Sequence, residues 1–134
     1  MDDARPEPTY RKLIAWQRAM DLTEMVYEAT DGQPEEETGH GPAADLRRAA
    51  STIPAKIAFG AGTRDPFMFL DSLSLADQAH RELGVLLDLA RRNEIVAFGP
   101  GQELEERCEE VGALIAELRR NLRGEPEDGW FAQG

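Results

Sequence analysis

Apolar residues recur three and four positions apart through most of this chain, and this spacing predicts helices rather than strands. The first periodic segment runs from Tyr10 to Thr30. Its stripe is Leu13, Trp16, Met20, Thr23 and Tyr27, widened by Ala19, Leu22, Val26 and Ala29. The stretch DGQPEEETGHG at 31–41 follows, and its turn formers and like charges predict an exposed loop.

A second helix is expected to begin at Pro42, because proline fits the first turn of a helix. The apolar stripe of this helix is Leu46, Ala50, Ile53 and Ile57. Gly60 and Gly62 are expected to end it, since glycine is the preferred residue just past a helix.

Pro54 lies inside this second helix, where it has no N–H to offer the carbonyl of Ala50. Such a proline costs about 3 kcal/mol unless neighbouring groups compensate. We expect the helix to bend there, with Ser51 or Thr52 bonding the freed carbonyl. The alternative interpretation is that the kink exposes carbonyl groups to a ligand or partner.

Two further helices are predicted. Asp65 is expected to cap the third and Pro66 to open it, followed by the stripe Phe69, Leu73, Ala76, His80, Leu83, Leu87 and Ala90. The sequence NEIVAFGPGQ is expected to end that helix. The fourth carries Leu104, Cys108, Val111, Ile115, Leu118 and Leu122, with acidic first turns and a basic end that suit the helix dipole.

Four amphipathic helices with short connections predict an all-α fold, an antiparallel up-and-down four-helix bundle with helix two kinked at Pro54. We expect residues 1–9 to be a flexible N-terminus, 10–124 to be the bundle and 125–134 to be a flexible acidic tail.

The stretch LRRAASTIPAKIAFGAG at 46–62 resembles a known family. It is similar to the pattern LRRAxxSIPxNIAEGxG of small bacterial four-helix bundle proteins encoded by intervening sequences in large-subunit ribosomal RNA genes. The matching structural motif includes Leu46, Ile53, Pro54, Ile57, Gly60 and Gly62. The segments YRKLIAWQRAMDL and ELGVLLDLARRNEI also resemble the family. Lys56 and Phe59 depart from it, because relatives usually carry Asn and Glu there.

This resemblance implies a state of assembly. Relatives form ring-like pentamers, so a homo-oligomer, specifically a pentamer, is expected here. A more distant branch comprises accessory proteins of diversity-generating retroelements, which grip a reverse transcriptase and nucleic acid through a basic surface. A function tied to the polar pair that Lys56 and Phe59 replace would be altered or lost in this chain.

Charge opposes a nucleic-acid partner, because the net charge is -11 and phosphate contacts depend on clustered Lys and Arg. Binding would therefore need a local basic patch. The candidate residues are Arg11, Lys12, Arg18, Arg47, Arg48, Lys56 and Arg64. The alternative for Arg47 and Arg48 is ion pairing with acidic residues of helix four.

Each residue pattern that suggests a metal site, a reactive thiol or a phosphate-binding loop also has a purely structural interpretation. Asp77 and His80 resemble half of a di-metal site, but no second pair exists on another helix, so His80 is expected to pack at a helix or subunit contact. Cys108 occupies a core position. The GAG of GAGTRD follows a helix rather than a strand, which excludes a phosphate-binding loop. We expect no enzyme activity and no metal or cofactor.

The C-terminal tail and the hydropathy of the chain give two further expectations, about a docking peptide and about the membrane. Trp130 and Phe131 lie in the acidic tail as either a partner-docking peptide or an anchor on the chain's own bundle. No apolar run approaches the roughly 20 residues of a membrane span, and no leader precedes the first helix, so a soluble, cytoplasmic protein with no membrane partner is expected.

Two functional hypotheses follow. The first is a non-enzymatic, oligomeric assembly or adaptor protein that binds a protein partner. The second is an RNA- or DNA-associated accessory protein, for example of a reverse transcriptase, that binds through the local basic patch.

Overall fold

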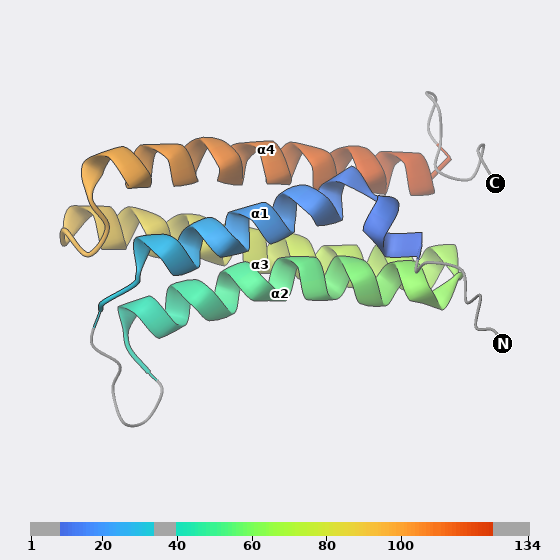
Figure 1. Ribbon diagram of the computed structural model, residues 1–134. Helices are drawn as coiled ribbons and strands as arrows, with labels where there is room; N and C mark the ends of the chain where they lie inside the picture. Colours follow the sequence, from blue (N-terminus) through green and yellow to red (C-terminus); the bar gives the residue numbers. More distant parts are fainter. Residues whose placement is uncertain (1–8, 34–39, 125–134) are drawn as a thin grey trace, which may run out of the picture.

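The computed structural model describes residues 9–33 and 40–124, which form helices and no strands. A short 3-10 helix, η1 (Thr9–Lys12), precedes α1 (Ile14–Ala29), α2 (Pro42–Thr63), α3 (Pro66–Arg92) and α4 (Phe98–Leu122). Each long helix packs on the next and α1 packs on α4, while the chain reverses direction at each connection (Figure 1). The predicted four-helix bundle is confirmed.

The helix boundaries agree with the sequence at some positions and differ at others. Asp65 caps α3 as predicted, its carboxylate accepting hydrogen bonds from the backbone N–H of Phe67 at 2.9 Å and of Met68 at 3.3 Å. The predicted helix from Tyr10 is shorter, because the 3-10 helix η1 covers its start. In the described part of the chain, none of the helices is long and apolar enough to cross a membrane.

The prediction that Gly60 and Gly62 end α2 is wrong. The helix continues to Thr63, and Arg64 supplies the left-handed residue at its end with a φ of 58°. Gly60 instead lies against α3, where an added Cβ would stand 2.7 Å from Phe69 Cδ1 and 2.9 Å from Ser72 Cβ. Its small size therefore serves helix packing, which favours continuing the helix past it.

The start of α4 is also corrected. The stretch expected to end α3 contains the first turn of α4, from Phe98 to Gly101. Pro100 is tolerated because the first turn needs no hydrogen bond from its nitrogen. Gly101 lets Arg91 of α3 pass, since an added Cβ would lie 2.9 Å from Arg91 Nε.

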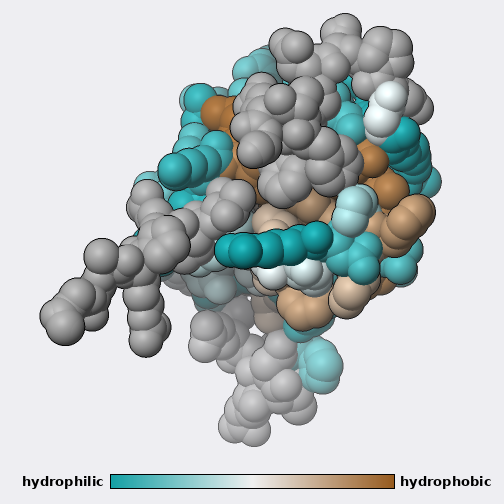
Figure 2. Space-filling view, turned by 90° about the vertical axis from the view of Figure 1, so that its right-hand side faces the viewer, coloured by the Kyte–Doolittle hydropathy of each residue, from teal (hydrophilic) through white to brown (hydrophobic). Residues whose placement is uncertain are grey.

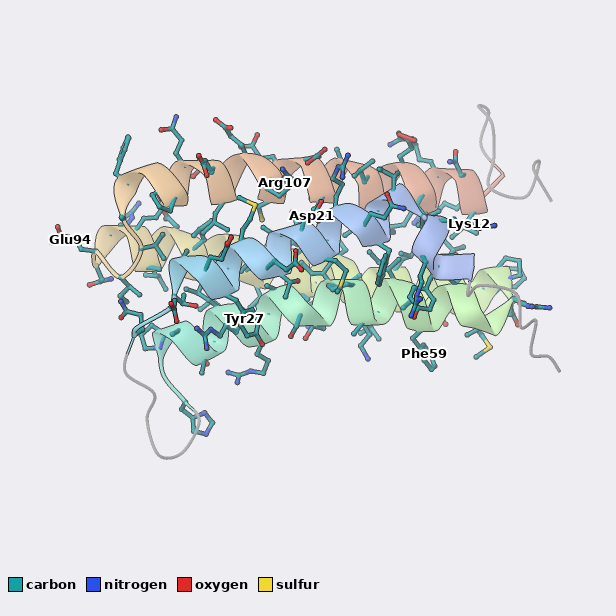
Figure 3. The ribbon with its side chains drawn as sticks, in the orientation of Figure 1. Lys12, Asp21, Tyr27, Phe59, Glu94 and Arg107 are labelled. Atoms are coloured by element: carbon teal, nitrogen blue, oxygen red, sulfur yellow. The ribbon has the colours of Figure 1, made fainter. Side chains whose placement is uncertain are left out.

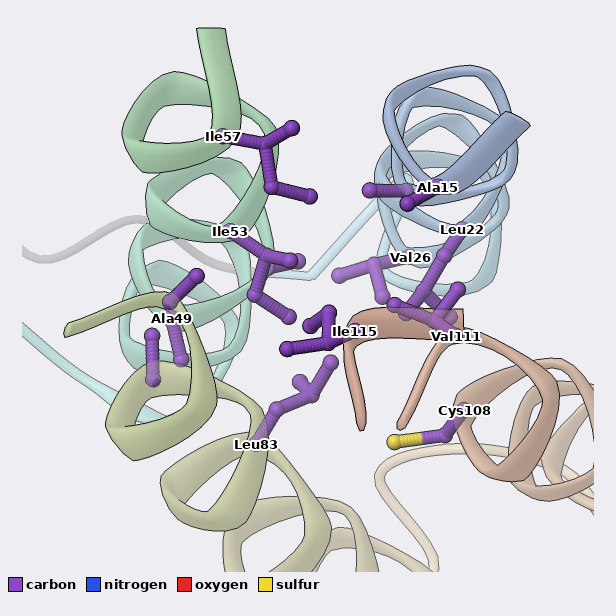
Figure 4. Close-up of a cluster of buried hydrophobic side chains, with 14 of the residues drawn as sticks. Ala15, Leu22, Val26, Ala49, Ile53, Ile57, Leu83, Cys108, Val111 and Ile115 are labelled. Carbon is purple, nitrogen blue, oxygen red and sulfur yellow. The ribbon is translucent and has the colours of Figure 1, made fainter. Parts of the chain in front are cut away.

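The core lies between the four helices, and most of its residues were predicted correctly. The stripes of α2 and α4 are fully buried, and that of α3 is buried except at His80, which is partly exposed. Ile53, Ile57, Leu83, Val111 and Ile115 converge in the interior (Figure 4). The spacing of these stripes thus identifies the buried face of three helices.

On α1 the structure buries a different stripe from the one that the sequence spacing predicts. Ala15, Ala19, Leu22 and Val26 form the core line, whereas Met20 and Tyr27 are 37% and 47% exposed. Both lines satisfy helical spacing, and contact with α2 and α4 decides between them. Ala19, Leu22 and Val26 are therefore filled positions of the monomer core and offer no surface to another copy.

Candidate interaction site

The hydrogen bond that Pro54 removes from α2 is partly replaced by a side chain of α1. Thr23 Oγ1 lies 3.1 Å from the carbonyl oxygen of Ala50 and 2.8 Å from that of Ala19, and its single hydroxyl proton is shared between them. The predicted donors are wrong, because Ser51 and Thr52 both donate to the carbonyl of Arg48, at 3.2 and 2.8 Å. Pro54 is buried and α2 is continuous through it. Ala50 is fully buried, so the carbonyl that Pro54 frees is not open to a ligand.

A second polar contact joins α2 to α3 beside Gly60. The hydroxyl of Ser72, which is 3% exposed, donates to the carbonyl of Lys56 at 2.7 Å. Two helices can approach this closely because Gly60 has no side chain. The motif residues around Pro54 thus fix the position of α2 between α1 and α3.

Arg47 is used inside the molecule. Its Nε donates to the hydroxyl of buried Thr30 at 2.8 Å, and its guanidinium lies 4.6 Å from the centre of the Tyr27 ring. Tyr27 lies where α1 approaches α2 (Figure 3). The expected ion pairs with helix four are wrong, because Arg47 binds α1 and Arg48 bonds Asp45 within α2.

The other predicted basic residues do not form one patch. Arg18 faces α4, with Glu110 at 3.5 Å and Asp21 at 3.3 Å. Asp21 also meets Arg107 of α4 at 3.4 Å, on the α1–α4 side of the bundle (Figure 3). Sequence reasoning missed this network, whose members have no motif and are brought together only by the fold.

The remaining members divide between two places. Arg11 and Lys12 belong to η1, which packs on α2, and Arg64 ends α2 at the same end of the bundle (Figure 1). Lys56 lies earlier in α2, before the last two turns of the helix, and is partly exposed. Only Arg11, Lys12 and Arg64 therefore share one end.

His80 packs at a helix contact, as predicted. Its Nε2 donates to the carbonyl of Cys108 at 2.7 Å, and Gly112 makes room for the ring, since an added Cβ would lie 2.6 Å from His80 Cε1. Asp77 forms ion pairs with Arg81 at 3.0 Å and Arg119 at 3.6 Å. Among the described residues, no group of three or more metal-ligating side chains is assembled.

Cys108 is buried in the predicted core position. Burial, together with the smaller effect of the charges of Glu109 and Glu105, raises the pKa of its thiol from 9.0 to about 11. The thiol is therefore protonated at neutral pH, where it behaves as a small apolar side chain.

Exposed apolar side chains gather on the outer side of α2 and α3. We name this surface the α2–α3 face; its large apolar residues are Phe59, Phe67, Met68 and Leu75, which are 47% to 78% exposed. Phe59 points away from the bundle (Figure 3). Viewed from the end where α2 finishes and α3 begins, apolar surface is open between hydrophilic side chains (Figure 2). Trp130 and Phe131, the other predicted docking residues, lie outside the described residues.

Comparisons with known proteins agree with this architecture. The family model described as 23S rRNA-intervening sequence protein matches residues 11–117. A crystal structure of a protein of unknown function from the S23 ribosomal protein family of Bacteroides thetaiotaomicron superposes with a TM-score of 0.71. It is 14% identical and the match covers 80% of this chain and 99% of the other, so it shows a shared fold. Curated proteins yield no match. Because the family model covers most of the bundle, the chain belongs to the 23S rRNA-intervening sequence protein family.

Proposed function

We propose that this protein is a non-enzymatic, self-assembling adaptor whose copies associate through the α2–α3 face and present other surfaces to a protein partner. The observation that carries the proposal is the exposure of Phe59, Met68 and Leu75, at 64%, 49% and 47%. Contiguous apolar surface of this kind marks interaction sites on soluble proteins.

The arrangement of these side chains supports a continuous surface. Met68 and Leu75 are seven residues apart, about two helical turns, which puts them on one side of α3. Phe59 adds exposed apolar surface from α2, and its neighbour in the sequence, Gly60, lies against Phe69 and Ser72 of α3. A pentameric ring, as the resemblance implies, would cover this face with a neighbouring copy.

Light scattering and sedimentation of the full chain at micromolar concentration test this proposal. We expect an oligomer, and we expect Phe59→Asp to raise its dissociation constant at least about tenfold by placing a charge in the buried contact. Phe98→Asp is the matched control, because Phe98 is 76% exposed but lies at the start of α4. A monomeric wild-type chain, or equal effects of both substitutions, would contradict the proposal.

The second candidate is an RNA- or DNA-associated accessory protein, and the packing of η1 on α2 favours a smaller version of its basic patch. Arg11, Lys12 and Arg64 are gathered at one end, whereas Arg18, Arg47 and Arg48 have partners within the fold. We expect the triple variant Arg11→Gln, Lys12→Gln and Arg64→Gln to abolish any retention of single- or double-stranded probes on filters at low salt. Absence of retention by the wild-type chain would dismiss this candidate.

A further inference from the structure

A small cavity opens at the end of the bundle opposite the α2–α3 turn. It has a volume of about 410 Å³ and lies between the start of α2, the last turns of α3 and the segment leading to α4. Its apolar lining is Pro42, Leu86, Leu89, Ala90 and Ile95. All of these come from helices or from residues hydrogen-bonded to them, including Ile95, whose N–H donates to the Ala90 carbonyl at 2.8 Å. The cavity is thus a built feature of the fold.

Two polar side chains stand at this cavity, and both offer acceptor atoms. Asp45 accepts a hydrogen bond from Arg48 on Oδ1, and within the described chain its Oδ2 has no such donor. Asn93 donates its side-chain N–H to the carbonyl of Leu89 at 2.8 Å, and its side-chain oxygen accepts no hydrogen bond from residues 9–33 or 40–124. The complement of such a site is an apolar group beside a hydrogen-bond-donating cation.

The exposure of the cavity walls indicates what kind of molecule the cavity can hold. Leu89 is 51% exposed and Pro42 is also exposed, so the walls are shallow. Sites for free small molecules usually enclose most of the ligand surface. A shallow apolar cavity suits a side chain presented by a larger partner.

We propose that this cavity binds a peptide segment of a protein partner in which an apolar residue adjoins a lysine or arginine. The apolar side chain occupies the space over Ala90, and the neighbouring cation is held by Asp45. This inference rests on the adaptor part of the proposed function and is independent of self-assembly, since the cavity lies at the other end of the molecule from Phe59.

The test is a titration of the isotope-labelled full chain with acetyl-Gly-Leu-Lys-Gly-amide, followed through backbone amide resonances. We expect shifts confined to the residues around the cavity, and much smaller shifts with the same peptide carrying Glu for Lys or Ser for Leu. Asp45→Asn should weaken binding at least threefold. Arg48→Ala should strengthen it, because Arg48 competes for the same carboxylate.

The outcomes separate this site from the proposed assembly. Equal binding of the Lys and Glu peptides, or equal effects of Asp45→Asn and Arg48→Ala, would overturn the charge recognition. No shifts with any peptide would overturn the site. Leu89→Ser, which removes one exposed wall, should abolish binding while the thermal unfolding temperature stays close to that of the wild type. Light scattering on the same samples measures the oligomeric state and therefore tests the proposed assembly separately.

Discussion

At the scale of single residues, the proline in α2 is accommodated by a hydroxyl from another helix. Sequence reasoning identified the unpaired Ala50 carbonyl correctly but looked for its donor among local residues. Thr23 lies 27 positions away, and only the packing of α1 on α2 brings its hydroxyl to 3.1 Å from that carbonyl. Local rules can identify an unsatisfied group, whereas its partner depends on the tertiary fold.

Replacing Thr23 with valine should lower the free energy of unfolding by about 1–3 kcal/mol, because the carbonyl of buried Ala50 loses the donor that α1 supplies. Urea unfolding of the variant measures this loss. In a Pro54→Ala background the restored N–H can bond Ala50, so the cost of the same threonine substitution should shrink. Equal costs in the two backgrounds would show that Thr23 contributes by packing alone.

Cys108 gives a prediction about pH. Its pKa is raised in the folded state, so the thiol contributes stability that is present below pH 9 and is lost as the pH rises toward about 11. We expect wild-type stability to fall over that range relative to Cys108→Ala. At pH 8, the folded thiol should react with an aromatic disulfide reagent at least about tenfold more slowly than the unfolded thiol. Equal reaction rates would contradict this protonated, inaccessible thiol.

At the scale of helices, the two glycines of the Gly-x-Gly pair have different roles. An added Cβ at Gly60 would press on Phe69 and Ser72, whereas at Gly62 it would meet nothing within 4 Å. Sequence reasoning predicts that both glycines end the helix, because spacing along one helix does not reveal on which side a neighbouring helix packs.

The matched substitutions Gly60→Ala and Gly62→Ala should therefore act in opposite directions. Gly60→Ala is expected to destabilise the protein by about 1–3 kcal/mol through overpacking against α3. Gly62→Ala should be neutral or stabilising by up to about 1 kcal/mol, because alanine favours helix more than glycine does. Thermal unfolding compares them, and a tolerated Gly60→Ala would refute the close approach.

At the scale of the whole molecule, the bundle and three of its four buried stripes could be predicted from the sequence. Each of those stripes contains several large apolar residues, such as Leu46, Ile53 and Ile57 on α2. On α1 two lines have the same spacing, and the larger residues Met20 and Tyr27 lie toward the outside.

Surface features were less predictable than the core. The motif arginines suggested a basic patch, but Arg47 is held by Thr30 and Tyr27 of α1. The Asp45 cavity had no sequence signal, because its lining comes from α2, α3 and the segment before α4. Sites assembled from several elements require the three-dimensional arrangement.

The hydrogen bond from the Thr23 hydroxyl also affects the order in which the helices of this chain fold. One turn of α2 receives its full set of backbone partners only when α1 lies beside it. Before α1 docks, the carbonyl of Ala50 has no hydrogen-bond donor, which weakens the middle of α2. We therefore expect the helical hairpin of α1 and α2 to fold and unfold as one cooperative unit.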